Sequence, residues 1–176
     1  MTYVNDSETV RANFKRARIL VVEDNDDYWV LIQRAMLQIL PEVVPVRASS
    51  QAQAHKFLED WSRDEWEMPK LVLLDLYLPE RSQGWQVLAD IRSLTAPCNQ
   101  VPVVMLSNST VQADIREAYR RGSSSYLIKP TVFNDWLDYF RQLRTYWWET
   151  VTLPQCVWLF NCNQAGNGRA AVRSQN

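Results

Sequence analysis

The run Leu71-Val72-Leu73-Leu74-Asp75 places a carboxylate directly after four apolar residues. A short, continuous apolar run is typical of a strand that is buried on both faces of a parallel sheet. In open α/β folds, ligands bind beyond the carboxyl ends of the strands. The sequence therefore predicts that Asp75 stands at the sheet edge where such folds place their chemistry.

Other apolar runs also end in side chains that can bind cations or anions. These side chains are Glu23 and Asp24 after residues 19–22, Ser107 after residues 103–106, and Lys129 after residues 126–128. Parallel strands end at a common edge, so we expect all of these groups to lie close to Asp75. Carboxylates suit a hard divalent cation, and an ammonium group pairs with phosphoryl oxygens. The set predicts a site that holds a divalent cation and a phosphoryl group.

Apolar residues at helical spacing separate these runs, which predicts strands and helices in alternation. Strands are predicted over residues 17–23, 43–47, 70–75, 103–106 and 126–128. The first two helices are predicted from Tyr28 to near Pro41 and from the caps Ser49 and Ser50 to Trp61. A third helix is predicted after a loop that contains Pro79 and Gly84, and its residues Val87 to Leu94 face inward. The last two are predicted from Val111 to a cap at Gly122 and from a cap at Thr131 to Leu143. Such alternation predicts a doubly wound α/β fold, in which helices cover both faces of a five-stranded parallel sheet.

Pro45 indicates where the second strand lies in this sheet. Proline has no N–H group to donate to a central ladder, so the strand over residues 43–47 is expected at an edge. An edge position for the second strand agrees with the strand order 2-1-3-4-5.

The length of 176 residues fits one domain with a terminal extension. We expect a flexible N-terminal segment over residues 1–16, the folded domain over residues 17–148, and a partly disordered C-terminal tail over residues 149–176. The tail is expected to be too short and polar for a second, DNA-binding or catalytic domain. It does contain one apolar stretch, Val157–Phe160.

Composition excludes several classes of partner and location. The formal net charge of −1 argues against nucleic acid as the main partner. No apolar stretch has the length of a membrane span, and the N-terminus lacks the pattern of a secretory signal. Three cysteines without metal-site spacing are expected to be free thiols in a reducing compartment. We therefore expect a cytoplasmic protein.

The residues at the strand ends resemble the receiver domain of two-component response regulators. The resemblance covers about residues 17–148 and rests on an ordered set of positions: Glu23-Asp24, Asp75, Pro79 four residues after it, Ser107, and Lys129-Pro130. It implies the flavodoxin-like, or CheY-like, fold and a response regulator of the single-domain type. It also implies phosphorelay signalling, with a sensor histidine kinase or a phosphotransfer protein as partner.

The resemblance implies a role for each site residue. Asp75 looks like the phosphoacceptor, which receives its phosphoryl group from a phosphohistidine. Mg²⁺ would be held by Asp24, Asp75, Glu23 directly or through water, and the backbone carbonyl of Tyr77. Lys129 and Ser107 would contact the phosphoryl oxygens. The protein would not be a turnover enzyme, although it could hydrolyse its own acyl phosphate.

In the family, phosphorylation acts through a conformational switch. Ser107 would move toward the phosphate, and Tyr126, three residues before the lysine, would turn inward. The two changes would alter the surface formed by the fourth helix, the fifth strand and the last helix. The output is expected to be protein contact, including a homodimer through this surface or through the C-terminal segment. Trp147-Trp148 and Val157–Phe160 motivate the dimer.

This sequence departs from the family pattern near the phosphorylation site. Asn108 follows Ser107, where the family has a small residue, and could narrow the pocket or alter the switch. Tyr77 and Ser109 occupy positions that modulate how water reaches the phosphoaspartate, and bulky Tyr77 predicts a shielded, longer-lived acyl phosphate. The loop from Asp75 to Gly84 is one residue longer than the common pattern.

Three other functions fit the sequence less well. A receiver-shaped scaffold or dimerisation module would need no phosphorylation, but the intact set of site residues argues against it. A phosphatase of the haloacid dehalogenase type would need a second Asp at position 77, where this chain has Tyr77. Nucleotide binding would need a Gly-rich phosphate loop, and only Gly84 and Gly122 lie within the domain.

Overall fold

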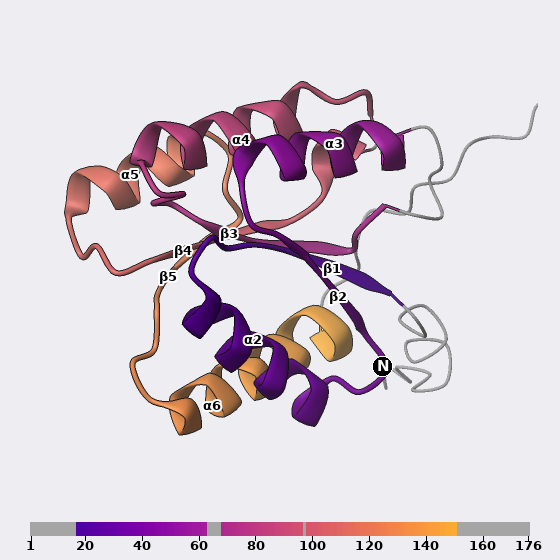
Figure 1. Ribbon diagram of the computed structural model, residues 1–176, viewed down its shortest axis with the longest axis vertical. Helices are drawn as coiled ribbons and strands as arrows, with labels where there is room; N and C mark the ends of the chain where they lie inside the picture. The colour runs from indigo at the N-terminus through magenta and orange to yellow at the C-terminus, as the bar shows by residue number, and fades with distance from the viewer. Residues whose placement is uncertain (1–16, 63–67, 97, 151–176) are drawn as a thin grey trace, which may run out of the picture.

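The computed structural model describes residues 17–62, 68–96 and 98–150 (Figure 1). Its centre is a sheet of five parallel strands in the order β2-β1-β3-β4-β5. The strands are β1 (Arg18–Val22), β2 (Val44–Ala48), β3 (Leu71–Asp75), β4 (Val103–Ser107) and β5 (Ser125–Ile128). The predicted fold class and strand order are therefore confirmed, and Pro45 lies on the edge strand β2 as expected.

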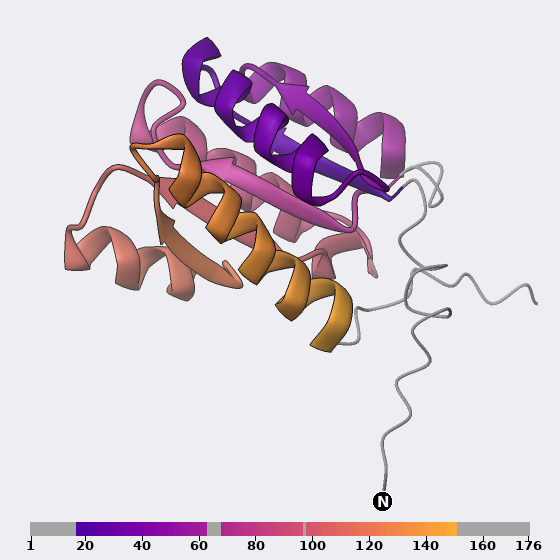
Figure 2. The same cartoon turned by 90° about the horizontal axis from the view of Figure 1, so that it is seen from below.

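Helices cover both faces of this sheet. They are α2 (Asp26–Ile39), α3 (Gln51–Ser62), α4 (Arg81–Ser93), α5 (Gln112–Arg120) and α6 (Phe133–Arg144), with a short 3-10 turn at Cys98–Gln100 and a π-helical turn at Thr145–Thr150. Figure 1 shows α3, α4 and α5 on one face and α2 and α6 on the other. In Figure 2, α2 and α6 lie side by side along the sheet. Among the described helices, none is long and apolar enough to span a membrane.

The two layers of helices produce two hydrophobic cores. Alternate residues of the central strands face opposite sides, so Leu71 and Leu73 pack toward α2 and α6, whereas Val72 and Leu74 pack toward α3 and α4. Every residue of β3 and β4 is buried. Polar groups of the central strands can therefore meet solvent only beyond the strand ends, which is where the predicted site lies.

Two predicted helix starts are wrong in detail. Gly84 was expected in the loop before the third helix, but α4 already begins at Arg81 and Gly84 lies inside it. Thr131 was expected to cap the last helix, but Val132 holds the N-cap position of α6 and makes no side-chain cap bond. At the other end of α5, Gly122 has the positive φ of 92° that suits the expected C-terminal cap.

Gly84 is required because α4 packs directly against the backbone that follows β3. A Cβ atom at this position would lie 2.2 Å from the carbonyl oxygen of Leu76 and 2.9 Å from that of Asp75. We expect Gly84→Ala to lower the free energy of unfolding by about 3 kcal/mol, because the backbone must shift to admit the methyl group. Urea unfolding would measure this loss.

Ala89→Ser is a matched control, since it also adds one heavy atom but on the exposed side of α4. Its expected effect is within about 0.5 kcal/mol. Equal stability of Gly84→Ala and wild type would show that the close approach of α4 to β3 is not tight.

Several expectations concern residues outside the described part of the chain. These are the flexible segment 1–16, most of the tail and the stretch Val157–Phe160. Of the tryptophan pair, Trp147 packs against the core between the sheet, α2 and α6, and the side chain of Trp148 is not described. The predicted dimer surfaces on these residues stay predictions.

Candidate functional site

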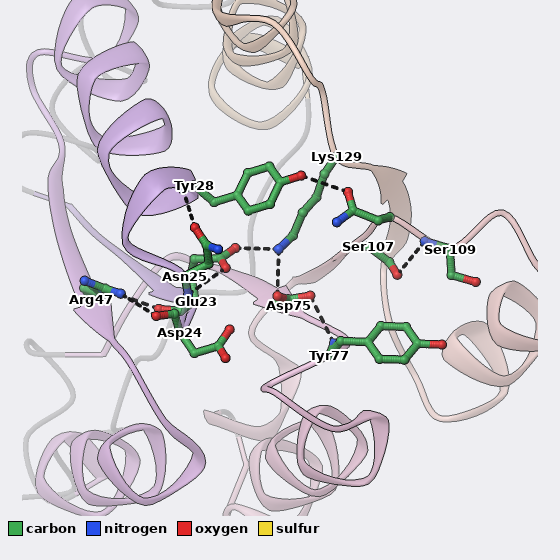
Figure 3. Close-up of polar contacts among 11 residues, drawn as sticks. Glu23, Asp24, Asn25, Tyr28, Arg47, Asp75, Tyr77, Ser107, Ser109 and Lys129 are labelled. Carbon is green, nitrogen blue, oxygen red and sulfur yellow. Dashed lines mark hydrogen bonds and ion pairs between the residues drawn. The ribbon is translucent and has the colours of Figure 1, made fainter.

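Asp75 ends β3, and its buried side chain makes polar contacts with Lys129 and Tyr77 (Figure 3). Its Oδ2 accepts a hydrogen bond from Lys129 Nζ at 2.6 Å, and its Oδ1 accepts one from the backbone N–H of Tyr77 at 3.0 Å. Asp75 is only 4% exposed. The two contacts hold the carboxylate in one orientation at the edge of the sheet.

Glu23 enters the same site from the end of β1. Its Oε2 accepts a second hydrogen bond from Lys129 Nζ at 2.7 Å, and its Oε1 accepts one from the backbone N–H of Asn25 at 3.2 Å. Lys129 follows β5, so its ammonium group joins acids from two other strands. The structure therefore brings together the acids and the amine that the sequence placed at separate strand ends.

Asp24 completes a cluster of three carboxylates with Glu23 and Asp75. Each of the three offers an oxygen atom, and these atoms lie within 4.8 Å of one another. Burial raises the pKa of Glu23 to about 7, against the opposing charge of Lys129. Burial also raises the pKa of Asp75, again against Lys129.

These pKa shifts mean that one ammonium group leaves the buried carboxylates short of positive charge. Hard carboxylate oxygens at this spacing are the ligands that divalent cations such as Mg²⁺ and Mn²⁺ prefer. The residues present therefore fit a divalent metal ion. The predicted ligand role of the Tyr77 carbonyl stays a prediction.

Arg47, which the sequence pattern did not predict, holds the loop that carries Glu23 and Asp24. From the edge strand β2, its guanidinium donates to the carbonyl of Glu23 at 3.0 Å and to that of Asp24 at 2.9 Å. It also pairs with Asp26 at 2.7 Å. The sequence signal that could have indicated this role is a basic residue near the end of the edge strand, whose neighbour β1 ends in an acidic loop.

Ser107 lies fully buried at the end of β4. Its Oγ accepts a hydrogen bond from the backbone N–H of Ser109 at 3.0 Å. The backbone N–H of Lys129 donates to the Ser107 carbonyl at 2.9 Å. Ser107 is thus tied to the backbone that carries the site lysine.

Tyr126 is half-buried, and its hydroxyl donates to the carbonyl of Ser109 at 2.9 Å. Burial raises the pKa of this phenol. The two predicted switch residues, Ser107 and Tyr126, are therefore joined through one short loop, so a shift of that loop would be felt at both.

Asp114, in the first turn of α5, links the loops that follow β3 and β4 and was not predicted from the sequence. Its carboxylate accepts hydrogen bonds from Arg81 at 2.7 Å, Ser109 Oγ at 2.9 Å and Tyr77 Oη at 3.3 Å. Burial alone would raise the pKa of Asp114, but these donors outweigh it and hold the pKa below its usual value. The Tyr77 ring is consequently held toward α5 on one side of the site.

Comparison with known proteins identifies the class to which this fold and site belong. The family model of the response regulator receiver domain matches residues 19–141 of this chain. The probable methanogenesis regulatory protein FilR2 of Methanothrix harundinacea is 34% identical over 149 residues, which cover 84% of this chain and 94% of that protein. Response regulator Rcp1 of Synechocystis is 33% identical over 141 residues, which cover 77% and 92%.

Solved structures agree with these relatives. The Mn²⁺-bound form of Rcp1 superimposes with a TM-score of 0.66 at 30% identity, covering 79% of this chain and 99% of that one. The phosphorylated cyanobacterial phytochrome response regulator RcpA superimposes with a TM-score of 0.69 at 29% identity, covering 80% and 99%. The chain belongs to the response regulator receiver domain family. It is a CheY-like protein of two-component signalling.

Proposed function

We propose that Asp75 accepts a phosphoryl group from a phosphohistidine of a sensor histidine kinase or phosphotransfer protein. The observation that carries this proposal is the contact of Lys129 Nζ with both Asp75 and Glu23, at 2.6 and 2.7 Å, beside the three-carboxylate cluster. The phosphorylated state of RcpA, a relative with the same fold, gives independent support.

The transfer needs a nucleophile and a way to offset negative charge. An oxygen of Asp75 forms a bond to phosphorus, the bond from phosphorus to the histidine nitrogen breaks, and that nitrogen keeps the electron pair. A bound divalent cation, which we take to be Mg²⁺, would offset charge between the carboxylate and the phosphoryl group. Asp24, Asp75, Glu23 and the Tyr77 carbonyl would hold it. Lys129 and Ser107 would donate to the phosphoryl oxygens.

The product is a modified protein, so we infer a signalling phosphoacceptor and not a turnover enzyme. Ser107 and Tyr126 would carry the change to the surface formed by α5, β5 and α6, because both form a hydrogen bond with the backbone of Ser109. Exposed Tyr119 and Ile128 on this surface are suited to protein contact, including contact with a second copy. We place this exchange in the cytoplasm, where sensor kinases obtain ATP.

Loading with a small phosphoryl donor tests the proposal directly. The full chain, incubated with acetyl phosphate and Mg²⁺, is expected to gain the mass of one phosphoryl group in an intact mass spectrum. The same mixture with excess EDTA is expected to show no gain, since the three carboxylates would then repel the donor. Equal gain with and without the cation would contradict the metal-assisted mechanism. No gain in either mixture would favour an unphosphorylated scaffold.

A further inference from the structure

Tyr28 covers the amine of the site lysine. It lies in the first turn of α2, and its ring faces the ammonium group of Lys129, with Nζ 4.3 Å from the ring centre (Figure 3). Its hydroxyl donates to Oδ1 of Asn108 at 3.2 Å. Because Asn108 follows β4, this contact joins α2 to the end of β4 across the edge of the sheet. We call Tyr28 and Asn108 together the strap.

The ammonium group of Lys129 has little room for a further partner. The ammonium group of Lys129 has three N–H bonds, and two of them are directed to Glu23 and Asp75. The Tyr28 ring covers the ammonium group as well, and the Lys129 side chain is only 2% exposed. A phosphoryl oxygen can therefore pair with Lys129 only if the ring moves aside or a carboxylate releases its hydrogen bond.

The two ends of the strap are anchored differently. At one end, the backbone N–H of Tyr28 donates to the side chain of Asn25 at 3.0 Å, and the N–H of Asn25 donates to Glu23. At the other end, Asn108 lies between Ser107 and Ser109, which are joined by their own hydrogen bond. The backbone is thus held on both sides. The exposed bond between Tyr28 and Asn108 is the contact that can open with least disturbance.

We propose that Tyr28 controls access to the ammonium group of Lys129, and that the hydrogen bond to Asn108 holds the Tyr28 ring in its covering position. This assigns a role to Asn108, whose side chain is larger than the small residue expected after Ser107. The phosphoryl group as the incoming ligand rests on the proposed function. The covering of Lys129 by Tyr28 does not, and it can be tested without phosphorylation.

The first test measures how fast a small reagent reaches the amine. Wild type, Tyr28→Phe, Asn108→Ala and the double variant are treated with limiting acetic anhydride, and acetylation of Lys129 is compared with that of exposed Lys56 by peptide mass spectrometry. Each single variant loses the hydroxyl contact and is expected to acetylate Lys129 about two- to tenfold faster, the range that one hydrogen bond supplies. Tyr146→Phe, which removes a hydroxyl from an exposed tyrosine in the π-helical turn after α6, is the matched control and is expected to match wild type.

The double variant decides whether the two residues act as one device. If they do, its acetylation rate equals that of the faster single variant, because the same contact cannot be lost twice. Wild-type acetylation rates in either single variant would overturn the proposal. Effects that multiply in the double variant would also overturn it.

Loading with acetyl phosphate and Mg²⁺ separates this inference from the proposed function. Both single variants are expected to be phosphorylated faster than wild type, by a factor similar to the increase in their acetylation rate. If wild type takes up no phosphoryl group, the proposed function fails, and the acetylation rates still decide whether the strap covers Lys129. Faster acetylation together with unchanged loading would overturn the strap as a control on phosphoryl access.

Discussion

Replacing Asp75 by asparagine is expected to abolish loading of the protein by acetyl phosphate. The amide has nearly the same shape as the carboxylate, but it lacks the charged oxygen that attacks phosphorus. The other acids of the cluster remain, so loading that depends on Glu23 or Asp24 would persist in Asp75→Asn. Intact mass spectra of the variant and wild type, taken over the same time course with Mg²⁺, measure the difference.

The fold of Asp75→Asn should survive, which makes the loss of loading interpretable. Burial raises the pKa of Asp75. At pH values above the usual pKa of an aspartate, the ionised side chain therefore destabilises the folded protein, and a neutral amide removes that cost. The amide also weakens one of the hydrogen bonds to Lys129 and Tyr77. We expect the two effects to offset, leaving the free energy of unfolding within about 1 kcal/mol of wild type. Full loading of the variant would reject Asp75 as the phosphoacceptor.

Replacing Lys129 by methionine is expected to reduce both stability and loading. Methionine keeps an unbranched side chain that is one atom shorter, but it lacks the charge that contacts Glu23 and Asp75. Two buried acids then lack a counter-ion, so at pH 7 one must take up a proton or stay charged and unpaired, which should lower the free energy of unfolding by about 3 kcal/mol. Loading should slow by roughly 10²-fold, because the phosphoryl oxygens lose a positioned donor.

The stability loss of Lys129→Met should depend on pH with a definite sign. The pKa of Glu23 is raised to about 7 even with Lys129 present, and removing the positive charge raises it further. At about pH 5 the cluster therefore binds protons in the folded state, and the difference from wild type should shrink. Urea unfolding at the two pH values measures this, with Lys56→Met at an exposed position as control. A loss that grows as the pH falls would contradict the assigned electrostatics.

The main parts of this site could be predicted because they depend on strand ends alone. Asp75, Glu23 and Lys129 each follow an apolar run, and a parallel sheet brings the ends of such runs to one edge. Similarly, Pro45 was enough to place β2 at the edge of the sheet, because proline cannot serve a central ladder.

The residues that surround the site could not be found in this way. Arg47, Tyr28 and Asp114 act through contacts with residues that are far apart from them in sequence, and no spacing rule connects them to these partners. The start of α4 was misplaced for a related reason. Glycine is typical of loops, which predicts Gly84 outside the helix, whereas its role is to let α4 approach the Leu76 carbonyl.

Borohydride trapping tests the central claim most directly. Sodium borohydride reduces an acyl phosphate to an alcohol, so a protein loaded with acetyl phosphate and then reduced keeps a permanent mark at the residue that carried the phosphoryl group. Peptide sequencing by mass spectrometry over residues 71–81 is expected to find homoserine at position 75. The account would be contradicted by homoserine at position 24 or by 5-hydroxynorvaline, the product of a reduced glutamyl phosphate, at position 23. It would also be contradicted if phosphorylated protein contained no reduced residue.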